Sequence, residues 1–196
     1  IVAEVIERFG ARVHAYCWMT NHIHLLIQVS DAPLGRIMLR IASRYARTVQ
    51  SRLQTTGHLF ERRYHAILVD QNAYLLTLLR YIHQNPLKAQ MVTSLADYRW
   101  SSHAAYAGQR SQSWVTTDFA LGMLHRERSM AVQAYLRLVD ELVPCEDLAP
   151  HQDDERVLGD DRFISRVLGI ASRPRSRKSL EDLMAEVCIK FCVTVD

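Results

Sequence analysis

The stretch RVHAYCWMTNHIHLLIQV, residues 12–29, decides how the first half of this chain folds. Two runs rich in apolar, aromatic and β-branched side chains flank Thr20 and Asn21, which predicts a β-hairpin. Successive side chains of a strand point to opposite faces, so His22 and His24 share one face of the second strand. Two neighbouring imidazoles on a rigid strand indicate a pair of ligands rather than core filling.

The segment after the hairpin predicts a helix over residues 36–53, because apolar side chains recur in it every four residues. A second stripe of this helix is basic and consists of Arg36, Arg40, Arg44 and Arg47. No acidic residue occurs between residues 32 and 60, so the four arginines repel one another unless an anion joins them. The stripe therefore indicates phosphate contact, and an ordinary solvated helix face is the alternative.

Further along the chain, residues 62–69 predict a strand and residues 71–85 a helix that Pro86 should end. Tyr81 and Asn85 lie four residues apart and so share a face of this helix. With an expected helix over residues 1–9, the order is helix, hairpin, helix, strand, helix. This order predicts an α+β fold with helices packed on an antiparallel sheet.

Composition narrows the class of partner. Of the 196 residues 48% are apolar, yet no apolar run approaches the ~20 residues of a membrane span, so no membrane partner is expected. Residues 1–112 carry 13 Lys and Arg against 6 Asp and Glu, whereas residues 113–196 carry 11 against 15. A basic first half predicts an anionic partner. Four cysteines without a CxxC motif fit a reducing cytoplasm.

We expect three regions. Residues 1–112 form the core, and residues 113–171 form a helical extension with helices near 117–126, 129–143 and 160–168. Residues 172–196 comprise a basic linker and a helix over 179–191, which we interpret as the first piece of a truncated helical domain. This segment weakly resembles a helix-turn-helix DNA-binding appendage.

Several motifs occur together in one order: YCWMTNHIHLLIQ, GHLFERRYHAILVD, LLRYIHQNPLKAQMV, DYRWSSHAAY and VLGDDRFI. In this combination the chain resembles the REP-associated tyrosine transposases, a branch of the IS200-like, single-tyrosine HUH transposases. The resemblance covers roughly residues 5–168. Thr20 stands where the family more often has Pro or Asp. The family's first sheet strand would precede Ile1, so this chain is expected to lack a central strand.

The resemblance implies a role for each motif residue. His22 and His24 resemble the metal ligands, Tyr81 the catalytic nucleophile, and Asn85 the polar residue that completes the metal site. Such enzymes cut single-stranded DNA beside a hairpin through a 5′-phosphotyrosine and free a 3′-OH. The implied setting is the bacterial, nucleoid-associated cytoplasm, with the protein acting as a monomer or homodimer.

The expected cofactor is a divalent metal, Mg²⁺ or Mn²⁺, because mixed nitrogen and oxygen ligands suit these ions, and Zn²⁺ is also compatible. Such an ion acts as a Lewis acid and template for a phosphate, and positive charge favours the phenolate of a tyrosine whose unperturbed pKa is ~10. The arginine stripe, with Arg62 and Arg63, is expected to follow a DNA backbone. Three aromatic residues either stack on bases or belong to the core: Trp18, Tyr64 and Trp100.

Two rival functions remain open at this point. A catalytically inactive or domesticated member would bind structured nucleic acid without cutting it. An unrelated metallohydrolase would use the two histidines with a carboxylate such as Asp70 or Glu61 and would not need Tyr81.

Overall fold

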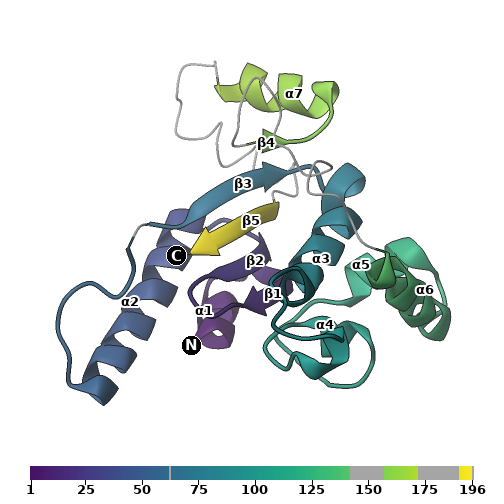
Figure 1. The fold of residues 1–196 in the computed structure, drawn as a ribbon. Helices are drawn as coiled ribbons and strands as arrows, with labels where there is room; N and C mark the ends of the chain where they lie inside the picture. The colour runs from purple at the N-terminus through teal and green to yellow at the C-terminus, as the bar shows by residue number, and fades with distance from the viewer. Residues whose placement is uncertain (62, 142–156, 172–189, 196) are drawn as a thin grey trace.

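The computed structural model describes residues 1–61, 63–141, 157–171 and 190–195 (Figure 1). The strands are β1 (Arg12–Trp18), β2 (Ile23–Gln28), β3 (His65–Val69), β4 (Val157–Leu158) and β5 (Lys190–Val195). The helices are α1 (Val2–Arg8), α2 (Leu34–Leu53), α3 (Gln71–Lys88), the 3₁₀ helix η1 (Leu95–Asp97), α4 (His103–Tyr106), α5 (Asp118–Leu124), α6 (Arg128–Asp140) and α7 (Asp161–Ala171). One sheet with helices packed on it confirms the α+β class. None of the helices in these ranges is long and apolar enough to cross a membrane.

The predicted hairpin is present as β1 and β2, which pair antiparallel with Trp18 opposite Ile23. Its turn is closed by a hydrogen bond of 2.8 Å from the Met19 N–H to the His22 carbonyl. β2 begins at Ile23, so His24 lies in the strand while His22 belongs to the turn. The two histidines are therefore held by backbone of different kinds.

The sheet has the order β1-β2-β5-β3-β4. Neighbouring strands are antiparallel except β3 and β4, which are parallel. β5 occupies the centre, paired on one side with β2 and on the other with β3, so the expected gap there is not observed (Figure 1).

The C-terminal strand corrects one sequence prediction. Of the helix expected over 179–191, residues 179–189 lie outside the described part of the chain, while Lys190 and Phe191 belong to β5. The run KFCVTV is rich in β-branched and aromatic residues, which suits a strand. The periodicity of apolar residues in this segment carries no information about β2 and β3. Pairing with these two strands is what makes residues 190–195 extended.

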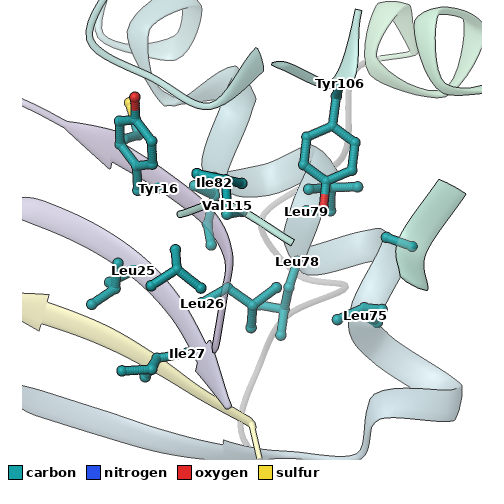
Figure 2. Close-up of a cluster of buried hydrophobic side chains, with 14 of the residues drawn as sticks. Tyr16, Leu25, Leu26, Ile27, Leu75, Leu78, Leu79, Ile82, Tyr106 and Val115 are labelled. Carbon is teal, nitrogen blue, oxygen red and sulfur yellow. The ribbon is translucent and has the colours of Figure 1, made fainter. Parts of the chain in front are cut away.

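Helix α3 packs on β1 and β2 and builds the main core (Figure 2). Its buried aliphatic side chains include Leu75, Leu78, Leu79 and Ile82, which lie in one cluster with Leu25, Leu26 and Ile27 of β2. Burying an aliphatic side chain of this size contributes ~1.5–3 kcal/mol. This packing fixes where the remaining residues of α3 point.

Helix α3 runs through Pro86 to Lys88, so the prediction that this proline ends the helix is wrong. Proline has no N–H to give to the carbonyl four residues earlier, which is that of Ile82. The side-chain Nδ2 of Asn85 donates to this carbonyl at 3.4 Å and to the Tyr81 carbonyl at 2.8 Å. The amide thus supplies a donor where the backbone has none, and the last turn persists.

Helix α2 confirms the predicted helix but buries only part of the expected apolar stripe. Ile37 and Ile41 are buried, whereas Tyr45 is 49% and Leu53 65% exposed. Figure 1 shows the C-terminal half of α2 extending past the sheet. The apolar stripe of α2 is therefore buried only in the N-terminal half of the helix.

The helices expected at 117–126, 129–143 and 160–168 correspond to α5, α6 and α7. Helix α6 is joined to α3 through the buried Gln84, whose Nε2 donates to the Val139 carbonyl at 2.8 Å and to the Glu141 carbonyl at 2.6 Å. The 113–171 region is not purely helical, because β4 adds to the sheet beside β3.

Candidate active site

The two hairpin histidines face each other. The Nε2 atoms of His22 and His24 are 3.1 Å apart, and their rings are nearly perpendicular, with centroids separated by 4.8 Å. His24 is buried on the strand, while His22 is partly exposed in the turn. The pair therefore presents two ring nitrogens at one point that is open on the His22 side.

Asn21 orients the first of these rings. Its side-chain Oδ1 lies 2.8 Å from Nδ1 of His22. A carbonyl oxygen only accepts, so the Nδ1 atom of His22 carries the proton and donates it, leaving a lone pair on Nε2. A metal-binding histidine typically donates its other ring N–H to such an oxygen, which fixes its tautomer and its orientation.

The nitrogen pair has the dimensions of a metal site. Imidazole nitrogens lie ~2.0–2.1 Å from a bound ion such as Zn²⁺, so two that ligate it at an angle between octahedral and tetrahedral values are ~2.9–3.4 Å apart. The 3.1 Å separation of the two Nε2 atoms lies within this range. The donor set therefore fits a divalent cation held by His22 and His24.

Tyr81 lies beside the histidine pair. Its ring meets that of His24 edge-on, with centroids 5.7 Å apart and an interplanar angle of 77°. The Nζ atom of Lys88 lies 4.9 Å from the centroid of the Tyr81 ring. Lys88 is two helical turns after Tyr81, so both side chains share one face of α3 because the helix continues past Pro86.

Asn85 has contacts of a different kind. Its Nδ2 atom is engaged by the carbonyls of Tyr81 and Ile82 within its own helix. Only the Oδ1 atom of the amide then remains to act as a ligand. The structure thus brings together His22, His24 and Tyr81, while Asn85 serves the end of α3 and stays a predicted ligand.

Among the described residues, no carboxylate joins the histidine pair as the metallohydrolase alternative requires. In the part of the chain that the structure describes, no group of three or more His, Cys, Asp or Glu side chains is arranged to hold a metal. This covers both Glu61 and Asp70, so that alternative has no third ligand of the expected type among the described residues.

A second histidine pair lies inside the protein. The Tyr135 hydroxyl joins Nδ1 of His83 at 2.8 Å to Nδ1 of His103 at 2.7 Å. Nε2 of His83 meets the Ser102 hydroxyl at 2.7 Å, and Ser102 also accepts the backbone N–H of Tyr16 at 2.9 Å. This hydrogen-bonded network connects α3 with α4, α6 and β1.

Burial controls the charge of the network. It lowers the pKa of His83 well below the ordinary value, and the nearby His103 adds to this effect. Burial likewise lowers the pKa of His103, against a smaller opposing effect of Asp140. The pKa of Tyr135 is raised by burial. All three groups are therefore neutral near pH 7.

The arginine stripe of α2 divides in two. Arg36, Arg40 and Arg47 are exposed and line a hollow of about 680 Å³ with Arg8 at the end of α1. Arg44 instead pairs with Glu4 of α1 at 2.5 Å, and the hydrogen bond from Arg44 lowers the pKa of Glu4.

The other predicted DNA contacts lie in the segment before β3. Arg63 is exposed there, whereas Arg62 lies outside the described residues.

A second hollow, of about 530 Å³, opens beside His22. Aromatic side chains contribute much of its wall: Trp18, Tyr45, Phe60 and Trp100. Of the proposed stacking residues, Trp18 is partly buried and stacks on Tyr16 at a centroid distance of 4.8 Å, whereas Trp100 is 53% exposed.

Sequence reasoning missed three contributors to this region. Lys88 was not considered because Pro86 was expected to end the helix. Its position seven residues after Tyr81 places it on the same face of a helix that continues. Asn21 stands directly before His22 and was assigned only to the turn. Arg8 is separated from the arginine stripe in the sequence by the β1–β2 hairpin. It lies beside the stripe only because α1 packs against α2.

Residues 1–85 match the sequence model of a family described as Transposase IS200 like. The matched range includes His22, His24, Tyr81 and Asn85, and it supports assignment to the IS200-like transposases. No curated protein and no solved structure is significantly similar to the chain. Transposases cut and rejoin DNA, so the match supports a DNA-cleaving, DNA-binding enzyme.

Proposed function

We propose that this chain is a single-tyrosine HUH transposase of the REP-associated branch, which cleaves single-stranded DNA beside a hairpin through a 5′-phosphotyrosine. The observation that carries the proposal is the edge-on contact of Tyr81 with a histidine pair whose Nε2 atoms are 3.1 Å apart. A nucleophile beside a phosphate-binding point is what phosphodiester cleavage requires.

His22, His24 and the Oδ1 atom of Asn85 would hold the metal, Mg²⁺ or Mn²⁺. Bound there, such an ion supplies Lewis-acid stabilisation of the negative charge that builds on the non-bridging oxygens of the phosphate. Asn21 keeps the lone pair of His22 directed at the site. Lys88 adds a positive charge beside the ring of Tyr81.

The proposed reaction is an exchange of phosphoesters. The Tyr81 hydroxyl gives its proton to solvent and its oxygen attacks phosphorus. The new O–P bond forms as the bond to the 3′-oxygen breaks, and that oxygen leaves with the electron pair and takes up a proton from solvent. One phosphoester bond replaces another, so a 3′-OH can reverse the step without ATP. This reversibility distinguishes a transposase from a nuclease.

The test is formation of a covalent adduct. Wild-type protein incubated with labelled single-stranded hairpin DNA and Mg²⁺ or Mn²⁺ should give an SDS-resistant species, and Tyr81→Phe should give none. Tyr74→Phe is the matched control, because Tyr74 is another partly buried tyrosine of α3. An equal yield from wild type and Tyr81→Phe contradicts the nucleophile assignment. Intact DNA binding with no adduct from either protein supports the inactive, nucleic-acid-binding alternative.

We further propose that Tyr81 serves the histidine pair of its own chain, since a single chain can place the Tyr81 ring against that of His24. A mixture of Tyr81→Phe and His24→Ala proteins should then remain inactive. Recovery of adduct in the mixture would mean that two chains of a dimer exchange the helix that carries the tyrosine.

Six arginines are proposed to contact DNA phosphates: Arg36, Arg40, Arg44, Arg47, Arg62 and Arg63. Removing one arginine–phosphate contact should reduce the slope of log affinity against log salt by about 0.7 for a single strand. Arg40→Ala should show this reduction, whereas Arg44→Ala should show less because Arg44 is already paired with Glu4. An unchanged salt slope for Arg40→Ala contradicts its assignment.

A further inference from the structure

The aromatic hollow beside His22 has exposed rings on its rim. Trp100 is 53% and Tyr45 49% exposed, and the Tyr45 ring lies 6.0 Å from that of Phe60 at a tilt of 40°. Such rings come from three separate segments: α2, the loop before β3 and the loop before α4. They surround an open space of about 530 Å³ rather than filling it.

This hollow borders the candidate metal site at His22. Asn21, His22 and Ile23 line it, so one ligand of the pair also forms its wall. Tyr81 and His24 are not among its lining residues, and Tyr81 contacts the pair through His24. The hollow therefore adjoins His22, whereas Tyr81 contacts His24.

Positive charge accompanies the rim. The guanidinium of Arg99 lies 4.7 Å from the centroid of the Trp100 ring, a cation–π arrangement at an exposed position. A flat aromatic rim next to an arginine suits a flat ring that is attached to a phosphate. Aromatic platforms combined with basic side chains are how proteins hold single-stranded nucleic acid without reading base pairs.

We propose that this hollow binds one unpaired nucleobase of the DNA strand, next to the phosphate held at the histidine pair, with Trp100 as its stacking surface. The inference rests on the proposed function and adds a positioning element to it. A base seated in the hollow fixes the adjoining sugar–phosphate against His22, so the reacting phosphate is oriented as well as neutralised.

The test measures binding without cleavage, in protein that carries Tyr81→Phe. The probes are a short oligodeoxythymidylate and an oligomer of the same length that consists of abasic sites, each followed by fluorescence anisotropy. Removing the bases should weaken binding about tenfold or more in the parent protein. With Trp100→Ala added, the loss caused by removing the bases should shrink to about twofold, because the stacking surface is gone.

Two further variants serve as controls. Trp100→Phe keeps an aromatic face and should restore most of the base dependence. Phe119→Ala removes an exposed ring of α5 that does not line the hollow, and it should leave the base dependence unchanged.

Two results overturn the inference. One is equal affinity of the parent protein for both oligomers. The other is that removing the bases weakens binding equally in the parent protein and in the Trp100→Ala variant. Neither depends on adduct formation. If no adduct forms yet base dependence vanishes with Trp100→Ala, the proposed reaction fails while the base site stands.

Discussion

The protein contains two histidine pairs that differ in what surrounds them. His22 and His24 face each other through their Nε2 atoms at 3.1 Å, and His22 also lines an aromatic hollow. His83 and His103 are both buried, and the Tyr135 hydroxyl between them engages a nitrogen of each. The imidazoles are alike, so the surroundings decide whether they are available to a ligand or serve only the fold.

The tyrosines beside the two pairs differ in the same way. Tyr81 is partly exposed next to His24, with a lysine near its ring. Tyr135 is fully buried, and burial raises its pKa, so its hydroxyl stays protonated and acts as a bridge. The comparison teaches that accessibility, rather than residue type, separates the candidate catalytic pair from the structural pair.

The largest expected effect comes from breaking the accessible pair. His22→Ala should slow adduct formation on the order of 1000-fold, because loss of a ligand removes several kcal/mol of charge stabilisation. The free energy of unfolding should change by less than about 1 kcal/mol, since His22 is partly exposed in a turn. A gel assay of the adduct and urea unfolding measure the two quantities. Chelation by EDTA should reproduce the first effect in wild-type protein.

Breaking the buried pair should give the opposite pattern. Tyr135→Phe leaves a buried ring nitrogen of both His83 and His103 without its present partner, at about 1–3 kcal/mol each. The free energy of unfolding should fall by about 3 kcal/mol, while Mn²⁺ affinity measured by calorimetry stays unchanged. Tyr74→Phe is the control and should alter neither quantity. A large loss of Mn²⁺ affinity in folded Tyr135→Phe would mean that the two pairs are coupled.

The buried pair also predicts a pH dependence of stability. Burial holds the pKa values of His83 and His103 below the ordinary ~6.5, so below that pH the unfolded chain binds more protons than the folded one. Stability should therefore be unaffected by these groups above about pH 6.5 and should decrease as the pH falls, by on the order of 2 kcal/mol at pH 5.5.

Urea unfolding at several pH values tests this dependence. The titratable groups that face His83 and His103 are Tyr106, Tyr135 and Asp140. His103→Gln should reduce the slope to about half. An unchanged slope in His103→Gln would show that another group titrates.

The smallest expected effect concerns the orientation of His22. Asn21→Ala removes the oxygen that holds Nδ1 of this ring, and Mn²⁺ affinity should fall about tenfold without a change in stability, because Asn21 is exposed. Asn21→Asp retains an acceptor oxygen and should restore much of the affinity. Equal affinities for wild type and Asn21→Ala would remove Asn21 from the site.

Much of the fold was predictable because its signals are local. The hairpin follows from two apolar runs around Thr20 and Asn21, and α2 and α3 follow from helical periodicity. The prediction of the end of α3 failed because one side chain compensates for the effect of a proline on the helix. Pro86 was expected to end α3, yet the Asn85 side chain supplies the donor that proline lacks, and Lys88 thereby reaches the Tyr81 ring.

The sequence by itself determined the hairpin with its two histidines, the arginine stripe and the helix that carries Tyr81, because each depends on spacing along a single element. Tertiary structure alone decided that His22 lines an open hollow, whereas His83 and His103 are joined inside the core. It also decided that residues 190–195 form the central strand. These outcomes depend on contacts between segments far apart in the chain, and no periodicity within one segment contains them.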